Sequence, residues 1–76
     1  MKNNRISNLA EFRRWVKIRL VEKEISQNEL ARQMGIPHAR ISEATHGKQS
    51  GNKYIIPIIE ERDGDVDDFK EFLKAI

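Results

Sequence analysis

The chain contains no cysteine, which excludes a disulfide framework and a thiolate metal site. Its two histidines, His38 and His46, do not make a metal site by themselves, and we expect neither a metal nor a cofactor. The segment GNKY lacks the G-x-x-x-x-G-K-[ST] spacing of a phosphate-binding loop, so nucleotide binding of that type is excluded. We predict that the chain is not an enzyme, because its carboxylates lie where water and helix dipoles account for them.

Long apolar runs are also missing. No run approaches the roughly 18 residues that a membrane-spanning helix needs, and the N-terminal MKNNRISN lacks the hydrophobic stretch of a signal peptide. We therefore expect a cytoplasmic protein with no membrane partner. With 76 residues, 38% of them hydrophobic, the chain predicts one domain, residues 1–76, around one small helical core.

Charge is present in both signs but is unevenly distributed. Residues 1–53 carry eleven Lys or Arg against five Asp or Glu, a balance of +6, whereas residues 54–76 carry three against seven, a balance of −4. A basic body with an acidic end is typical of a protein that meets phosphates on one face and turns the opposite end away from them. The alternative interpretation is an ordinary solvated surface, since 34% of the residues are charged.

Residues 26–35 carry the signals of a short helix with both ends marked. Ser26 is a good N-cap, and Glu29 three residues later completes a capping box. Apolar residues then recur at helical spacing as far as Met34. Gly35 follows, the residue type that takes the left-handed conformation at a helix end without steric cost. We expect a helix from about Gln27 that ends at Gly35.

A second short helix is expected from about His38 to His46, because Pro37 suits the start of a helix rather than its continuation. If Ile41 points inward, a rotation of about 100° per residue places Ala44 on the same inner side. The outer face then shows short, hydrogen-bonding side chains instead of the long Lys and Glu of a helix that only covers a core. Such a face suits the reading of base edges.

The stretch SQNELARQMGIPHARISEATHGK resembles the helix-turn-helix of the lambda-repressor and Cro-like family, also called XRE-like. The matching positions are Ser26-Gln27, Leu30-Ala31, Gly35-Ile36, Ile41 and Gly47-Lys48. Two positions differ: Glu24 stands where members often have glycine, and Ala44 where they often have a larger aliphatic residue. The resemblance implies an all-α, five-helix lambda-repressor-like DNA-binding domain with a central helix-turn-helix at about residues 26–47.

The same resemblance implies which residues meet DNA. Side chains at the start of the second motif helix and one turn later enter the major groove in this family, which here means His38, Ala39, Ser42 and Glu43. The first turn of the first motif helix and the polar segment after Gly47, which we expect to be a loop, lie on the DNA backbone. The residues predicted to contact that backbone are Gln27, Asn28, Arg40, Lys48, Ser50, Asn52 and Lys53.

Two of these residues have alternative interpretations. Glu43 either accepts a hydrogen bond from a cytosine amino group or pairs with Arg40 or His46 and orients them, since an unpaired carboxylate is repelled by phosphates. Arg40, turned to the side of its helix, contacts either a phosphate or a guanine.

Before the motif, Asn8 and Glu11 predict the start of a helix that runs to about Lys23. Its apolar stripe is expected in the core, with Trp15 at the core edge. Its basic residues indicate a solvated face, with phosphate contact for one or two of Arg13, Arg14, Lys17 and Arg19. Residues 1–7 are expected to be loose, with Lys2 and Arg5 able to follow DNA as an arm.

After the motif, we expect a helix from Tyr54 to about Arg62, with Pro57 either in its first turn or at a kink, and a last helix capped by Asp65. The apolar residues of these helices either fill the core or meet a second subunit. The residues predicted to form a dimer or partner surface are Ile55, Ile58, Ile59, Phe69, Phe72 and Ile76.

These patterns together predict a sequence-specific, double-stranded DNA-binding transcriptional regulator of bacterial or phage type. Most members of the family it resembles are repressors, and we expect it to bind as a homodimer across an approximate palindrome. The alternative is an adaptor that has this fold and binds a partner protein through its acidic C-terminal helices. An antitoxin-like module is a third interpretation.

Overall fold

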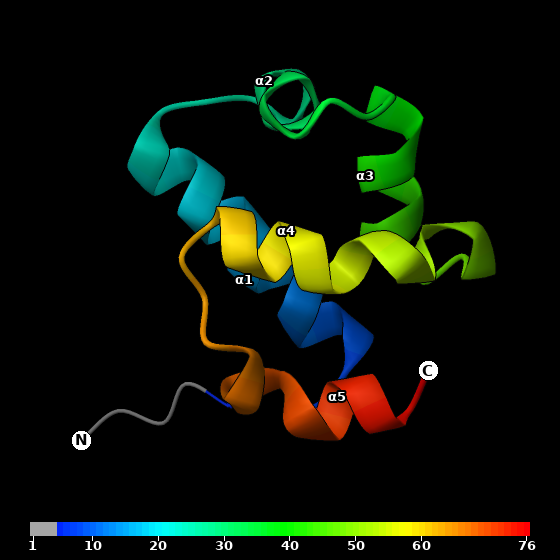
Figure 1. Ribbon diagram of the computed structural model, residues 1–76. Helices are drawn as coiled ribbons and strands as arrows, with labels where there is room; N and C mark the ends of the chain where they lie inside the picture. The colour runs from blue at the N-terminus through cyan, green and yellow to red at the C-terminus, as the bar shows by residue number, and fades with distance from the viewer. Residues whose placement is uncertain (1–4) are drawn as a thin grey trace.

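The computed structural model describes residues 5–76, which fold entirely into helices and the turns between them, without a strand (Figure 1). This confirms the prediction of an all-α chain. The α-helices are α1 (Leu9–Lys23), α2 (Gln27–Met34), α3 (His38–Thr45), α4 (Ile55–Glu61) and α5 (Lys70–Lys74). The 3-10 helices are η1 (Gln49–Tyr54), directly before α4, and η2 (Val66–Phe69), directly before α5.

The ends of α1 follow from local chemistry. The Asn8 side chain accepts a hydrogen bond from the Glu11 backbone N–H (2.9 Å), and the Glu11 carboxylate accepts one from the Ser7 N–H (2.7 Å). The helix ends at Lys23, as predicted, because Glu24 takes the left-handed conformation with φ 58°. This conformation is one that glycine adopts freely and other L-residues adopt at a cost.

The signals predicted for α2 are confirmed. Ser26 Oγ accepts from the Glu29 N–H (3.1 Å), and Gly35 takes φ 69° directly after Met34. Pro37 then precedes α3, whose first residue is His38. The turn between the two helices is therefore as short as the sequence predicts.

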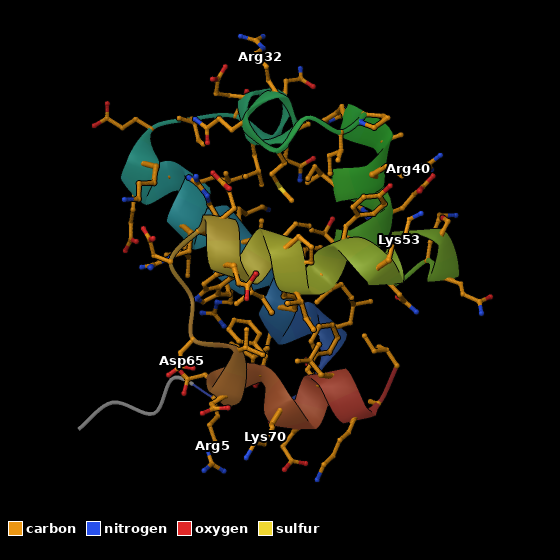
Figure 2. The ribbon with its side chains drawn as sticks, viewed as in Figure 1. Arg5, Arg32, Arg40, Lys53, Asp65 and Lys70 are labelled. Carbon is orange, nitrogen blue, oxygen red and sulfur yellow. The ribbon has the colours of Figure 1, made fainter. Side chains whose placement is uncertain are left out.

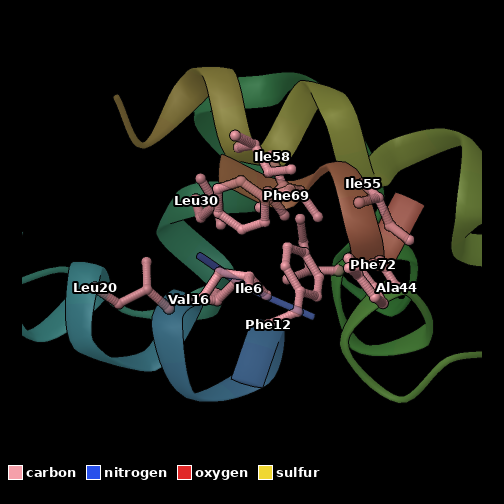
Figure 3. Packing of buried hydrophobic residues seen from close by; sticks show 13 residues of the cluster. Ile6, Phe12, Val16, Leu20, Leu30, Ala44, Ile55, Ile58, Phe69 and Phe72 are labelled. Atoms are coloured by element: carbon pink, nitrogen blue, oxygen red, sulfur yellow. The ribbon is translucent and has the colours of Figure 1, made fainter. Parts of the chain in front are cut away.

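The core is shared by helices from the whole chain (Figure 3). The Phe12 ring of α1 stacks on Phe72 of α5 at a centroid distance of 5.0 Å and meets Phe69 edge-on at 6.1 Å. Trp15 lies at the edge of this cluster, edge-on to Phe69, as expected. The C-terminal helices thus complete the core that α1 begins.

This packing corrects the prediction of a dimer or partner surface. Five of its six residues are at most 2% exposed, buried in the core of their own chain: Ile55, Ile58, Ile59, Phe69 and Phe72. The surplus of apolar residues therefore fills the core, which was the other interpretation. Only Ile76, 52% exposed, remains at the surface from that set.

Two further details of the C-terminal half follow from the structure. Pro57 is the third residue of α4, so its missing N–H falls in the first turn of that helix, as one interpretation proposed. Asp65 does act as a cap, accepting from the Asp67 N–H (3.0 Å), but the turn that it caps is the 3-10 helix η2 rather than the start of an α-helix.

The segment before α1 is not loose at its described end. Ile6 is buried, and its N–H donates to the Asp68 carbonyl (2.8 Å). Arg5 lies at the acidic end of the molecule beside Lys70, far from α3 (Figure 2). This corrects the expectation that Arg5 belongs to an arm on DNA; Lys2 lies outside the described residues.

No helix within residues 5–76 is both long enough and apolar enough to cross a lipid bilayer.

Candidate nucleic-acid interface

The orientation predicted for α3 is confirmed. Ile41 and Ala44 are completely buried beneath the helix, where they contact the core. The opposite side, here called the reading face, is open to solvent: two of its residues are exposed and two partly exposed. The reading face comprises His38, Ala39, Ser42 and Glu43.

The segment after α3 is a 3-10 helix packed on α3, not the predicted loop. A Cβ atom on Gly51 would lie 2.3 Å from the Ala44 backbone nitrogen, so only glycine allows this approach. The Lys48 N–H also donates to the Glu43 carbonyl (2.9 Å). The small Ala44 therefore accompanies a close contact between the backbones of η1 and α3, which fixes η1 beside the reading face.

A hydrogen-bonded cluster joins η1 to α3 through Glu43. Glu43 Oε1 accepts a hydrogen bond from Arg40 Nη1 (2.6 Å) and another from Ser50 Oγ (2.9 Å). The hydrogen bond from Arg40, and then that from Ser50, hold the pKa of the Glu43 carboxyl below its usual range, against the opposing effect of burial. The same Glu43 hydrogen bond raises the pKa of Arg40.

His46 is not the partner of Glu43. Its Nδ1 donates to the Ser42 carbonyl (2.8 Å), since a carbonyl oxygen only accepts. The choice between Arg40 and His46 that the sequence left open is therefore settled in favour of Arg40.

A cleft of about 440 Å³ lies between α1, the start of α2 and the end of α3; we call it the cationic cleft. Its polar lining comes from Arg13, Lys17, Gln27, Thr45 and His46 over a floor of Val16 and Leu20. Among the described residues, neither Arg13 nor Lys17 has an acidic partner within 4.0 Å, and the cleft contains no carboxylate. The cleft therefore presents uncompensated positive charge to an anion.

The sequence predicted phosphate contact for one or two of four basic residues of α1, but it did not predict this cleft. Arg13 and Lys17 are four residues apart and so share one side of α1, which is the signal that could have selected them. Arg19 is engaged elsewhere: it donates to the Arg62 and Asp63 carbonyls, pairs with Glu22 and lies over the Trp15 ring. It is therefore removed from the set of phosphate-contacting candidates.

The start of α2, where the sequence places Gln27 and Asn28, forms one end of the cleft. Gln27, the first residue of α2, lines the cleft, and Asn28 beside it is exposed. Ser26 Oγ accepts a hydrogen bond from the Glu29 N–H. The backbone N–H groups of the residues before Glu29 have no hydrogen-bond partner within α2. An anion in the cleft is favoured by these N–H groups and by the helix dipole.

The remaining backbone-contact residues do not all join this surface. Lys48 and Ser50 are exposed on η1, and the Lys53 ammonium lies 5.4 Å from the Tyr54 ring centroid while remaining exposed. Asn52 is a correction: its Oδ1 is buried without a hydrogen-bond partner, and the residue lines a hollow beside Leu9, Ile55 and Phe72. It faces the C-terminal helices rather than a DNA backbone.

The acidic C-terminal segment around η2 lies away from α3 and η1 (Figure 2). Figure 2 shows Arg40 and Lys53 beside α3 and η1, and Asp65 toward the opposite side. The acidic residues at that end have local structural partners: Asp63 pairs with Lys23 (3.5 Å), and Asp65 caps η2. Basic residues accompany this segment too, since Arg5, Lys70 and Lys74 line one hollow with Asp67, Asp68 and Glu71.

Comparison of the chain with protein-family models, with curated proteins and with solved structures returned no match to any of them.

Proposed function

We propose that the chain is a sequence-specific double-stranded DNA-binding transcriptional regulator of the lambda-repressor-like type, a repressor of bacterial or phage kind that works in the cytoplasm. The observation that supports this most strongly is the reading face of α3, which carries varied hydrogen-bonding groups and has cations on both flanks. The cationic cleft lies on one flank and η1, with Lys48 and Lys53, on the other.

The dimensions of this surface suit the major groove. An α-helix with its side chains is about 10–12 Å wide, and the groove of B-DNA is about 12 Å wide. When α3 lies in the groove, the elements on its two sides meet the phosphates that border it. In this arrangement Gln27 and the cleft contact one backbone, Lys48 and Lys53 contact the other, and His38, Ala39 and Ser42 meet base edges.

The proposal includes a homodimer on DNA, because one eight-residue α3 covers only a few base pairs. Two copies would place their reading helices on half-sites about one helical turn, or roughly 34 Å, apart. The dimer contact cannot use the buried residues of α4, η2 and α5, so it falls to exposed apolar positions such as Ile76.

The adaptor hypothesis loses the apolar part of the surface on which it was based, while acidic residues such as Glu60 and Glu71 stay exposed. Its apolar residues in α4 and α5 are core residues, and two of its acidic residues, Asp63 and Asp65, already serve the fold. The DNA-binding hypothesis keeps its surface, so it is the better supported of the two.

A salt titration of DNA binding tests the proposal. Four cations of the proposed interface are in no ion pair among the described residues: Arg13, Lys17, Lys48 and Lys53. If three or four of them neutralise phosphates, the logarithm of the affinity should fall against the logarithm of the salt concentration with a slope of about −2.7 to −3.6. Fluorescence anisotropy with a labelled duplex measures this slope, and a flat plot would refute the proposal.

A pair of variants provides the control. Lys48→Ala should make the slope less steep by about 0.9, because it removes one phosphate contact. Lys70→Ala removes the same charge from the exposed acidic end and should leave the slope unchanged. Equal effects of the two variants would show that net charge alone, rather than this surface, binds DNA.

A further inference from the structure

The carboxylate of Glu43 is committed to two donors before any ligand arrives. Its Oε1 atom accepts from Arg40 within α3 and from Ser50 in η1, at 2.6 and 2.9 Å. The Glu43 side chain is 24% exposed, and its bond from Arg40 is partly buried, whereas its bond from Ser50 lies at the surface. If Glu43 bound a cytosine amino group, it would do so with an oxygen already bonded to Arg40 and Ser50, or it would first have to break these bonds.

Arg40 gains a fixed orientation from the same contact. A guanidinium has five N–H donors in a planar fork, and Glu43 engages one of its terminal nitrogens. Besides Glu43, the Tyr54 side chain interacts with Arg40 and adds to the rise of its pKa, and the Arg40 side chain is still 39% exposed, so the rest of the fork can be reached by a ligand. Figure 2 shows Arg40 on the side of α3 that faces away from the body of the molecule.

The charge of the pair argues for a base rather than a phosphate as the partner of Arg40. Arg40 and Glu43 together carry no net charge, so their long-range attraction for phosphates is small compared with that of an unpaired Lys48. What the pair offers instead is a set of donors in a defined plane. Guanine presents two acceptors, O6 and N7, that match such a planar fork in the major groove.

We infer that Arg40 is a specificity-determining residue that donates to a guanine, and that Glu43 and Ser50 are positioning residues that hold it. This inference rests on the proposed DNA-binding function and names the residue that reads one G·C base pair. It also explains why a carboxylate is tolerated at the centre of a DNA-facing surface, since its charge is already neutralised by Arg40.

Selection of bound sequences from a random duplex pool tests the inference, with salt titrations of each variant. Arg40→Lys keeps the charge but loses the planar fork, and should lose a preference of roughly tenfold for one G·C pair while binding random DNA as before. Ser42→Ala should leave that preference intact. If Arg40→Lys retains it, the inference is overturned.

Glu43→Gln distinguishes a positioning role from direct reading. If Glu43 only positions Arg40, this variant frees a positive charge, so random DNA should bind more tightly and the salt slope should steepen by about 0.9, while the G·C preference weakens. If Glu43 itself reads the cytosine of that pair, Glu43→Gln should abolish the preference while Arg40→Lys retains it. The second outcome would overturn the inference.

A measurement on the free protein separates this inference from the proposed function. NMR signals of the Arg40 side-chain N–H groups should be sharp and slow to exchange in the wild type, and broadened in Glu43→Gln and, to a smaller extent, in Ser50→Ala. Sharp signals with no duplex binding at any salt concentration would refute the DNA-binding function and the guanine contact while confirming the Glu43 contact. Broad wild-type signals would overturn the positioning role even if DNA is bound.

Discussion

The α3–η1 unit and the α4–η2–α5 unit were both predicted from the sequence to meet a partner. The structure separates them: α3 buries Ile41 and Ala44 and presents its polar side, whereas α4, η2 and α5 turn their largest apolar residues into the core. Varied hydrogen-bonding groups on one side of a short helix therefore predicted a surface correctly. A surplus of apolar residues did not, because the chain's own core also needs them.

The largest effect expected from this comparison is in α4. Ile58→Ala should lower the free energy of unfolding by about 2–5 kcal/mol, because it removes a completely buried side chain. Ile56→Ala, at a position 43% exposed in the same helix, should cost less than about 0.5 kcal/mol. Urea denaturation monitored by circular dichroism measures both, and similar costs would mean that α4 does not pack as described.

A smaller effect is expected where η1 contacts α3. Gly51→Ala should cost about 1–3 kcal/mol, since the added Cβ would overlap the Ala44 backbone. Gly35→Ala is the matched control. Nothing lies within 4 Å of a Cβ atom at this position, so the free energy of unfolding should fall by roughly 1 kcal/mol, only because alanine is strained at a φ of +69°. Thermal unfolding ranks the two variants, and a higher cost for Gly35→Ala would contradict the close packing of η1.

The smallest effect concerns the end of α1. Glu24→Gly should stabilise the protein by about 0.5–1 kcal/mol, because glycine takes φ 58° without strain and this gain exceeds its entropy cost. Arg14→Gly, at an exposed position inside α1, should instead destabilise by about 1 kcal/mol. Chemical denaturation of both variants checks the sign, and a destabilised Glu24→Gly variant would show that the left-handed conformation carries no strain.

The features that could be predicted from the sequence are those set by neighbouring residues. Asn8, Ser26 and Gly35 act within one helical turn of their own position, so their roles follow from residue type alone. The orientation of α3 followed from the helical period once Ile41 was placed inside. The predicted reading face needed nothing from the rest of the chain.

The remaining features depend on contacts between distant segments. The cationic cleft joins Arg13 of α1 to His46 after α3, and the burial of Asn52 depends on the helices that follow it. The left-handed conformation of Glu24 is contrary to residue preference and was not predicted, although Glu24 stands where members of the family it resembles often have glycine. These features depend on how distant segments pack together, which residue spacing and residue preference do not specify.

A chemical-shift map of the labelled protein with a short duplex at low salt tests the central claim most directly. The account predicts that amide signals of Lys17, Gln27, Ala39 and Lys48 shift with added DNA, while those of Glu60 in α4 and Lys74 in α5 stay in place. Shifts confined to α4 and α5, or no shifts at all, would contradict the claim that α3 and the cations beside it form the DNA-binding surface.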